Sequence, residues 1–259
     1  MIFALIAASV LTTSRTETRL TRYHAQKAEL GAVAEAGVNL AILQLLDPAG
    51  PAPPTDATPF TIDFAGRQVV VAIQDEAGKV DLNTAPEELL RQLFSTAGLD
   101  LDASQAMAER ILDWREPGLL KRPNGAKADD YRAVGLPYGP RNAPFESVEE
   151  ARLVLGMIPA LYDRLVPSLT VYSQNPWPNP DFAGLDVLRS LPGIGDDQAD
   201  AILRERAARA AAGQSSVLRG HAFTITDRVE ERGATRAGKR AVIRLTGLAA
   251  APYLVYFWN

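Results

Sequence analysis

The stretch FTIDFAGRQVVVAI, residues 60–73, alternates apolar and polar positions on both sides of Ala65-Gly66. A period of two is typical of β-strands, and Ala-Gly can form the turn between them, so this stretch predicts a β-hairpin. The alternation stops at Gly78, and a long helical sequence punctuated by proline follows before alternation returns at Phe223. This order predicts an α+β protein, in which a small sheet domain carries an inserted all-α domain.

Three alternating runs follow near the C-terminus, with apolar members at Phe223, Ile225 and Val229, at Ala241, Ile243 and Leu245, and at Leu254, Tyr256 and Trp258. We expect these strands to join the hairpin in one antiparallel sheet. That pairing would bring both ends of the insertion together at little entropic cost. The predicted boundaries are 48–79 and 217–259 for the discontinuous sheet domain and 80–216 for the inserted helical domain.

A long helix is predicted over residues 1–47. Its apolar beginning, MIFALIAASVL (residues 1–11), is about half of the roughly 20 residues that a bilayer-spanning helix needs. Apolar and small residues then recur at helical spacing until Pro48, where Asp-Pro-Ala-Gly-Pro is a stop signal. The pattern favours one helix with a membrane-embedded part and a part that packs on the sheet. Two ordinary helices with an unmarked break are the alternative.

Composition narrows the function. The chain has 259 residues, and its 27 Lys and Arg against 31 Asp and Glu give a net charge of −4. There is therefore no global positive field to recruit nucleic acid. The absence of cysteine excludes disulfides, thiolate metal sites and cysteine nucleophiles. His24 and His221 are the two histidines, neither lies in an HExxH or triad-like context, and no GxSxG or Walker-type loop occurs, so we expect no enzyme.

Helix starts within the insertion are marked by polar residues. Thr84 to Glu87 and Ser147 to Glu150 match the capping-box pattern, and Asp102 with Gln105 is a third candidate. These signals predict that the insertion is built from several short helices.

The segment LPGIGDDQA (residues 191–199) matches the helix-hairpin-helix pattern, with its turn at Gly193, Ile194 and Gly195. Such turns can hold a phosphate through exposed backbone N–H groups. The first turns of the following helix carry the carboxylates of Asp196, Asp197 and Asp200. These would repel a phosphodiester backbone, so a structural, protein-binding hairpin is favoured. The alternative is a helix-hairpin-helix protein that binds nucleic acid. A basic face on the protein would favour that alternative.

Several phrases along the chain are shared with one family. They are ALIAAS (4–9), KVDLNTA (79–85), ILDW (111–114), DDY (129–131), NAPF (142–145), SVEE (147–150) and LPGI (191–194). Through these phrases the chain resembles the type II secretion system minor pseudopilin K family, also called general secretion pathway protein K. The resemblance covers nearly the whole chain.

The resemblance implies a pilin-like fold, in which a long N-terminal helix packs on a small antiparallel sheet. The inserted all-α domain is expected to contain helix-hairpin-helix and SAM-like modules. It further implies a non-enzymatic role at the tip of a pseudopilus, with minor pseudopilins I and J as partners, in initiating the pseudopilus and supporting secretion across the outer membrane. The implied location is the inner membrane of a Gram-negative cell, with the soluble domain in the periplasm.

Members of the family begin with a short basic leader, a Gly-Phe site cut by prepilin peptidase and a full membrane helix. Here no basic residue precedes the apolar run, and the run is shorter than a full span. We therefore expect the upstream reading frame to encode the leader, the cut site and further apolar residues. No residue of this sequence is assigned to processing.

Members of the family have been associated with calcium in the helical domain. The candidate ligands here are Asp113, Glu116, Asn124, Asp129 and Asp130. They surround a loop containing Pro and Gly, and calcium takes about six to eight oxygen ligands of this kind. Lys121, Arg122 and Lys127 in the same loop would oppose a cation, and a solvated acidic loop is the alternative.

The tip complex of the family is held by packing between pilin helices. Small residues that would let neighbouring helices approach closely recur on the first helix, at Ala28, Gly31, Ala34, Gly37 and Val38. We expect this face to bind pseudopilins I and J.

Overall fold

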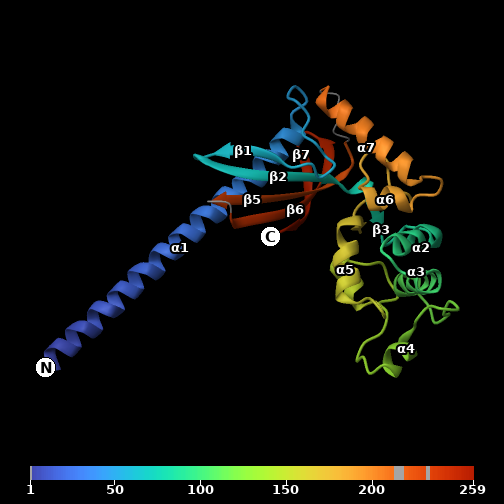
Figure 1. The fold of residues 1–259 in the computed structure, drawn as a ribbon, viewed down its shortest axis with the longest axis horizontal. Coiled ribbons are helices and arrows are strands. Elements are labelled where there is room, and N and C mark those ends of the chain that lie inside the picture. The colour runs from blue at the N-terminus through green and yellow to red at the C-terminus, as the bar shows by residue number, and fades with distance from the viewer. Residues whose placement is uncertain (1, 213–218, 232–233) are drawn as a thin grey trace.

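The computed structural model describes residues 2–212, 219–231 and 234–259. It contains a long helix, a β-sheet on which one end of that helix lies, and a group of shorter helices beside the sheet (Figure 1). Helix α1 runs without a break over Ile2–Leu46, which confirms one helix and not two. It ends at the predicted stop, where Asp47 Oδ1 accepts a hydrogen bond from the Ala49 N–H group (2.9 Å).

The N-terminal part of α1 stands clear of the sheet (Figure 1). By length and composition alone, Arg19–Leu46 could cross a membrane, but 44% of its most apolar window is buried inside the protein. That burial comes from packing on the sheet, where Ala34 and Val38 are fully buried. The apolar residues of this part of α1 therefore serve the protein core.

The sheet has five strands in the order β1-β2-β5-β6-β7, and all neighbours are antiparallel. They are β1 (Phe60–Phe64), β2 (Arg67–Asp75), β5 (Ala222–Glu231), β6 (Ala234–Leu248) and β7 (Ala251–Trp258). Strands β2 and β5, which flank the insertion in sequence, pair directly, with Asp75 opposite Phe223. The predicted antiparallel sheet is confirmed. The predicted hairpin is also confirmed, and Ala65 and Gly66 in its turn have φ angles of 51° and 73°.

The alternating residues Leu254, Tyr256 and Trp258 of β7 do not all pack on the core under α1. Trp258 packs against the core, whereas Leu254 and Tyr256 are 49% and 44% exposed. The pairing of β6 with β7 shifts between Val242 and Ile243. A shift of one residue turns the side chains beyond it to the other face of the sheet. Leu254 and Tyr256 are therefore not part of the core under α1, and the Tyr256 ring stacks on that of Tyr172 at 5.6 Å.

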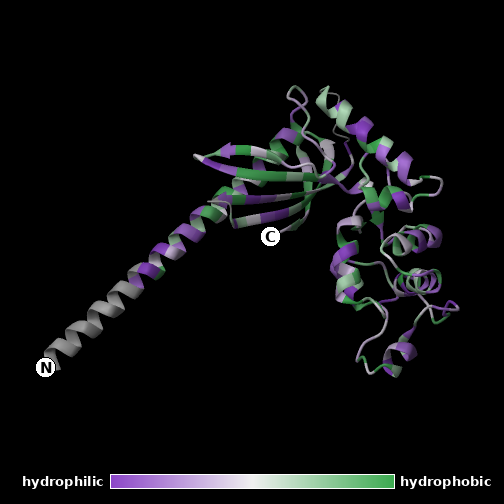
Figure 2. Ribbon diagram, viewed as in Figure 1, coloured by the Kyte–Doolittle hydropathy of each residue, from purple (hydrophilic) through white to green (hydrophobic). Residues whose placement is uncertain are grey.

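Helix α1 covers one face of the sheet and forms the first core with it. Its members are Leu30, Val33, Ala34, Val38, Ala41, Ile42 and Leu45 of α1, with Val69, Val71, Ile73, Phe223, Ile225, Val229, Ala241, Ile243 and Leu245 of the strands. Figure 2 shows hydrophobic positions along these strands and hydrophilic ones on the coloured stretch of α1 next to the sheet. Burying each large side chain contributes about 1.5–3 kcal/mol.

The insertion forms a second core of its own, built from residues between Val80 and Ala199. Its α-helices are α2 (Glu87–Thr96), α3 (Leu101–Arg115), α4 (Ala128–Ala133), α5 (Pro159–Leu165), α6 (Leu185–Ser190) and α7 (Asp196–Ala211), with 3-10 turns at Glu76–Gly78, Val148–Leu153 and Val166–Ser168. The insertion is not entirely helical, because β3 (Val80–Asp81) pairs in parallel with β4 (Leu169–Thr170). Strands of two residues are too short to produce an alternating pattern.

The three predicted capping boxes are wrong. Helix α2 has no side-chain cap, because Thr84 Oγ1 donates to Asn175 O instead (2.7 Å). Helix α3 begins earlier than expected and is capped by Asp100, whose Oδ1 accepts from the Ala103 N–H group (2.8 Å). Ser147 precedes a 3-10 turn and makes no cap bond. For Thr84 the reason is its tertiary partner, which the local sequence pattern does not show.

The two cores meet at a close junction. Gln74 Nε2 donates to Phe182 O (3.0 Å), and the Asn179 N–H group donates to Ala77 O (2.7 Å). At Gly78 a Cβ would lie 2.2 Å from the same Phe182 oxygen, so a side chain does not fit. The helical unit is therefore held closely against the C-terminal end of β2.

The domain boundaries remain a prediction, which excision of the insertion tests. Replacing residues 80–216 with a short Gly/Ser linker is expected to leave a soluble, β-rich protein. The reason is that the two ends of the insertion meet where β2 pairs with β5, and the two cores share no residue. Far-ultraviolet circular dichroism is the measurement, and loss of the β signal would contradict the two-domain interpretation.

Candidate functional site

The predicted partner-binding face of α1 is largely covered by the protein's own sheet. Ala34, Gly37 and Val38 are buried there. Ala28 is exposed, and nothing lies within 4 Å of the position that a Cβ would take at Gly31. The prediction is therefore wrong for Ala34, Gly37 and Val38. Small residues three and four apart share one helix face, and here that face lies on the chain's own strands.

Gly37 is the point of closest approach between α1 and the sheet. A Cβ at this position would lie 2.6 Å from Asp227 Oδ2 and 2.6 Å from Val69 Cγ1. Carbon atoms at an optimal contact are about 3.5–4 Å apart. Glycine is thus required for α1 to approach β2 and β5 this closely.

Asp227 is a buried carboxylate that the sequence analysis did not single out. It continues the inward-facing positions Phe223 and Ile225 of β5 and is 7% exposed. Its Oδ1 accepts a hydrogen bond from the Lys239 N–H group (2.8 Å), whereas Oδ2 has no hydrogen-bond partner among the described residues. Burial raises the pKa of Asp227 from 3.8 to about 6. An acidic residue at an inward position of an alternating run was the signal available in the sequence.

The loop between α3 and α4 is organised around a buried ion pair. Asp113 is fully buried, and its Oδ1 accepts from Arg122 Nη1 (3.0 Å) while its Oδ2 accepts from the Arg122 backbone N–H group (3.2 Å). Arg122 Nη2 also donates to Glu116 Oε1 (2.7 Å). This hydrogen bond lowers the pKa of Glu116 and raises the pKa of Arg122. One guanidinium group therefore pairs with two of the predicted calcium ligands.

Lys127 places its ammonium group in the same loop and is 8% exposed. Its Nζ donates to Asp113 O (2.6 Å), Glu116 O (3.1 Å) and Asn142 Oδ1 (3.0 Å). Asn142 is held with a φ of 53°, and its N–H group donates to Trp114 O (2.8 Å). An ammonium group has three N–H donors, so all of them are used.

The other predicted ligands have separate partners. Asn124 forms hydrogen bonds with a glutamate of α3. Asp130 Oδ1 accepts from Lys121 Nζ (2.7 Å), which lowers the pKa of Asp130. Asp129 is exposed and pairs with Arg132. The structure brings Asp113 and Glu116 together through a shared arginine, and it points the remaining three elsewhere.

The five candidate ligands, tested as a group, do not fit a calcium ion. In the part of the chain that the structure describes, no group of three or more His, Cys, Asp or Glu side chains could hold a metal. At Asp113 the approach is blocked, because a Cβ on Gly125 would lie 1.9 Å from Oδ2. The backbone of Gly125 therefore fills the space beside this carboxylate, where an ion would need about 2.3–2.6 Å to each oxygen.

The segment around Gly193 forms a tight turn between α6 and α7, with a φ of 79° at Gly193. Gly195 is the N-cap of α7, and Ile194 packs against the helical core. Arg189 Nε pairs with Asp196 Oδ1 (2.8 Å). The helix start is thus occupied by acidic side chains, one of them bound to arginine. This arrangement does not favour a phosphate, and the nucleic-acid alternative has no support.

The phrases that carry the family resemblance meet in the helical unit. Asn83 Nδ2 donates to Phe145 O (3.0 Å), and the Phe145 N–H group donates to Asn83 Oδ1 (2.7 Å). Trp114 Nε1 donates to Glu150 Oε1 (2.8 Å), and its ring stacks on that of Phe145 at 6.0 Å. Segments distant in sequence are therefore tied into one framework around α3, which fixes the loops without creating a reactive centre.

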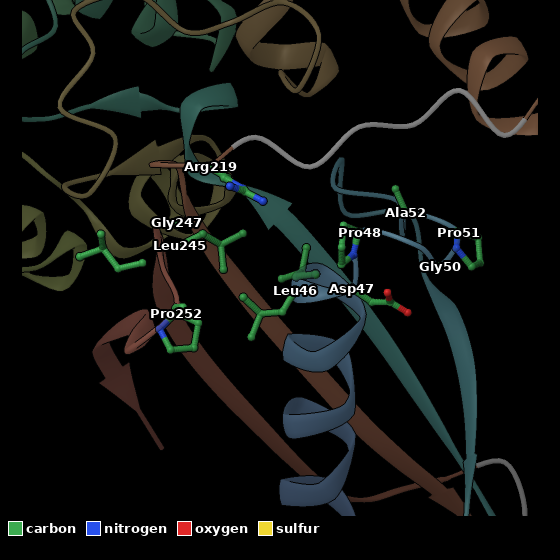
Figure 3. Close-up of a pocket in the computed structure, with 13 residues that line it drawn as sticks. Leu46, Asp47, Pro48, Gly50, Pro51, Ala52, Arg219, Leu245, Gly247 and Pro252 are labelled. Carbon is green, nitrogen blue, oxygen red and sulfur yellow. The ribbon is translucent and has the colours of Figure 1, made fainter.

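A cavity of about 690 Å³ lies between the end of α1 and the β6–β7 hairpin (Figure 3). Leu45, Leu46 and Leu245 supply apolar surface, and Asp47 and Arg219 are the charged residues of the lining. The 13 described residues that line it include no Ser, Thr, His, Lys or Tyr. The described lining therefore offers no hydroxyl nucleophile and no imidazole or amine base, and Asp47 is its one carboxylate.

The two histidines have structural surroundings. His221 Nδ1 lies 2.8 Å from the buried Asp75 Oδ2, at the junction of the cores, and its ring meets Phe182 edge-on. Burial raises the pKa of Asp75. His24 is exposed on α1 beside Tyr23.

The architecture defines a class of protein. A long N-terminal helix that covers one face of a small antiparallel sheet is a pilin-like fold, and here a helical unit is inserted between β2 and β5. Comparison with known proteins shows which family the chain resembles in sequence. Residues 69–174 match the family described as "Type II secretion system (T2SS), protein K".

Curated relatives agree with this match. The chain is 28% identical to type II secretion system protein K of Pseudomonas aeruginosa over 159 residues, which is 58% of this chain and 47% of the relative. It is 30% identical to the protein of the same name from Dickeya chrysanthemi over 131 residues, which is 46% of this chain and 34% of that relative. The match therefore spans about half the length of the Pseudomonas relative and about a third of the Dickeya relative.

A solved structure has a similar fold over 94% of this chain. It is "The Crystal Structure of the GspK-GspI-GspJ complex from enterotoxigenic Escherichia coli Type 2 Secretion System". One of its chains is similar with a TM-score of 0.61 and 18% identity, over 94% of this chain and 98% of that chain. Together these findings show that the chain is similar in sequence and in fold to type II secretion system protein K.

Proposed function

We propose that this protein is a minor pseudopilin at the tip of the type II secretion pseudopilus. In this role it assembles with minor pseudopilins I and J, initiates the pseudopilus and supports protein secretion across the outer membrane. The observation that carries the proposal is the agreement between a family match to residues 69–174 and a similar fold over 94% of the chain. The solved neighbour was obtained as a GspK-GspI-GspJ complex, which supports the same kind of assembly here.

The same proposal gives the protein a place in the cell envelope. Helix α1 continues from the sheet to Ile2, and its first residues are apolar in sequence. We propose that this end lies in the inner membrane, that the sheet and the helical unit lie in the periplasm, and that prepilin peptidase processes the full-length precursor.

We propose a smaller partner surface on α1 than the five residues that the sequence indicated. With Ala34, Gly37 and Val38 buried against the sheet, Ala28 and Gly31 are the small residues that remain open to a neighbour. We propose that the flank containing Ala28 and Gly31 is where a pseudopilin helix packs. The hairpin at Gly193, Ile194 and Gly195 is proposed to act as a helix-hairpin-helix module with a structural or protein-binding role, within SAM-like helical modules.

Enlarging Gly31 tests the assembly. Gly31→Leu is expected to reduce the yield of the complex with pseudopilins I and J from the same organism, because overpacking a close contact costs about 1–3 kcal/mol. That cost corresponds to roughly a 5- to 150-fold weaker association. Co-purification of the three soluble domains, followed by size-exclusion chromatography, is the measurement.

The matched control is Ala36→Leu, which adds a side chain of the same size to another flank of α1 and is expected to leave the complex intact. Equal yields for wild type and Gly31→Leu would remove the Ala28–Gly31 flank from consideration. Failure of the wild-type protein to associate with either pseudopilin would contradict the proposed function itself.

A further inference from the structure

The loop between α3 and α4 carries its own cations at the position where the sequence indicated a metal. The Lys127 ammonium group is enclosed by three oxygen atoms, Asp113 O, Glu116 O and Asn142 Oδ1, at 2.6, 3.1 and 3.0 Å. Two of these are backbone carbonyls of the end of α3, and the third comes from a loop that follows α4. The ammonium group thus joins three segments, as an oxygen-coordinated cation would.

The charges of this loop are already balanced. Asp113 and Glu116 supply two negative charges, and Arg122 and Lys127 supply two positive charges within hydrogen-bond distance of the same residues. Adding a divalent cation would leave this group of four residues with an excess of two positive charges, next to the buried Asp113 and Lys127. Such an excess is strongly unfavourable, because like charges repel most where water does not screen them. The space beside the Asp113 carboxylate is also taken by Gly125.

We propose that Lys127, together with Arg122, takes the structural place of a bound metal ion in this protein, so that the helical unit orders its α3–α4 loop without calcium. The proposal depends on the contacts of Lys127 and is independent of the function proposed above. It makes two predictions, one for the wild-type protein and one for a variant that loses the ammonium group.

The first test compares wild-type protein in calcium chloride and in a calcium chelator. The melting temperature is expected to be the same in both, because no carboxylate pair of the loop is free to take up the ion. Differential scanning calorimetry is the measurement. A calcium-dependent rise in melting temperature that disappears in Glu116→Gln, a change at a half-exposed carboxylate of this loop, would overturn the proposal.

The second test replaces Lys127 with methionine, which keeps the length of the side chain and removes its charge. Lys127→Met is expected to lower the melting temperature by at least about 4 °C, because three buried oxygens lose their donor. Lys121→Met is the matched control, since Lys121 pairs with Asp130 at the surface and is expected to matter little. Equal melting temperatures for Lys127→Met and wild type would overturn the proposal. If Lys127→Met does not fold, the calcium comparison on the wild-type protein still tests the proposal.

Discussion

Replacing Gly37 with leucine is expected to lower the free energy of unfolding by about 3 kcal/mol. Even the first carbon of the new side chain would lie 2.6 Å from Asp227 Oδ2 and from Val69 Cγ1. Both neighbours are buried beneath α1, so α1 would have to move away from β2 and β5. Urea unfolding followed by circular dichroism measures this loss. Gly37→Ala should also lower the free energy of unfolding. At an exposed helix position the same change would raise it by about 1 kcal/mol, because alanine has the higher helix propensity.

Gly31 provides the matched control within the same helix. No atom lies within 4 Å of the position of its missing Cβ. Gly31→Ala is therefore expected to raise the free energy of unfolding by up to about 1 kcal/mol, through helix propensity alone. Equal losses at Gly31 and Gly37 would contradict the packing described for α1, because only one of the two positions faces the sheet.

The sheet could be predicted from sequence because its two faces differ in their surroundings. Val69, Val71 and Ile73 of β2 alternate with less buried residues, and this alternation places one row of side chains under α1. The same signal located β5 and β6 at the other end of the chain. It failed at Leu254 and Tyr256, since a register shift depends on how β6 pairs with β7 and leaves no local pattern.

The function of the small residues on α1 could not be predicted in the same way. Glycine and alanine at helical spacing indicate that something approaches closely, but they do not say what. For Gly37 the neighbour is Asp227, which lies on a strand near the other end of the chain. The small residues therefore predicted a close contact of the helix. They did not tell whether that contact is with a partner or with the protein's own sheet.

The calcium expectation met a similar limit. The sequence places acidic and basic residues together in one loop, which allows either a metal site or a set of ion pairs. The outcome depends on Asn142, whose side-chain oxygen completes the environment of the Lys127 ammonium group. Asn142 belongs to a different loop and is positioned by its own backbone bond to Trp114. No spacing within the α3–α4 loop could reveal this contribution.

The carboxylate of Asp227 makes the stability of the core depend on pH. Burial under α1 raises its pKa from the ordinary value of 3.8 to about 6. The folded protein therefore binds this proton more tightly than the unfolded chain does. The contribution to stability is fully present below about pH 3.8 and is lost as the pH rises through about 6. A shift of this size corresponds to roughly 3 kcal/mol over the whole range.

Asp227→Asn is expected to remove this dependence. The amide oxygen can still accept the hydrogen bond from Lys239, but the side chain no longer acquires a charge on deprotonation. Relative to wild type, the variant should gain about 2–3 kcal/mol in free energy of unfolding between about pH 4 and pH 7.5. Urea unfolding across that range measures the gain, and other titrating groups cancel in the difference. Asp63→Asn, at an exposed position of β1, should show no such trend. A constant difference between Asp227→Asn and wild type would contradict the raised pKa, because a carboxylate with an ordinary pKa would already be charged over most of the range.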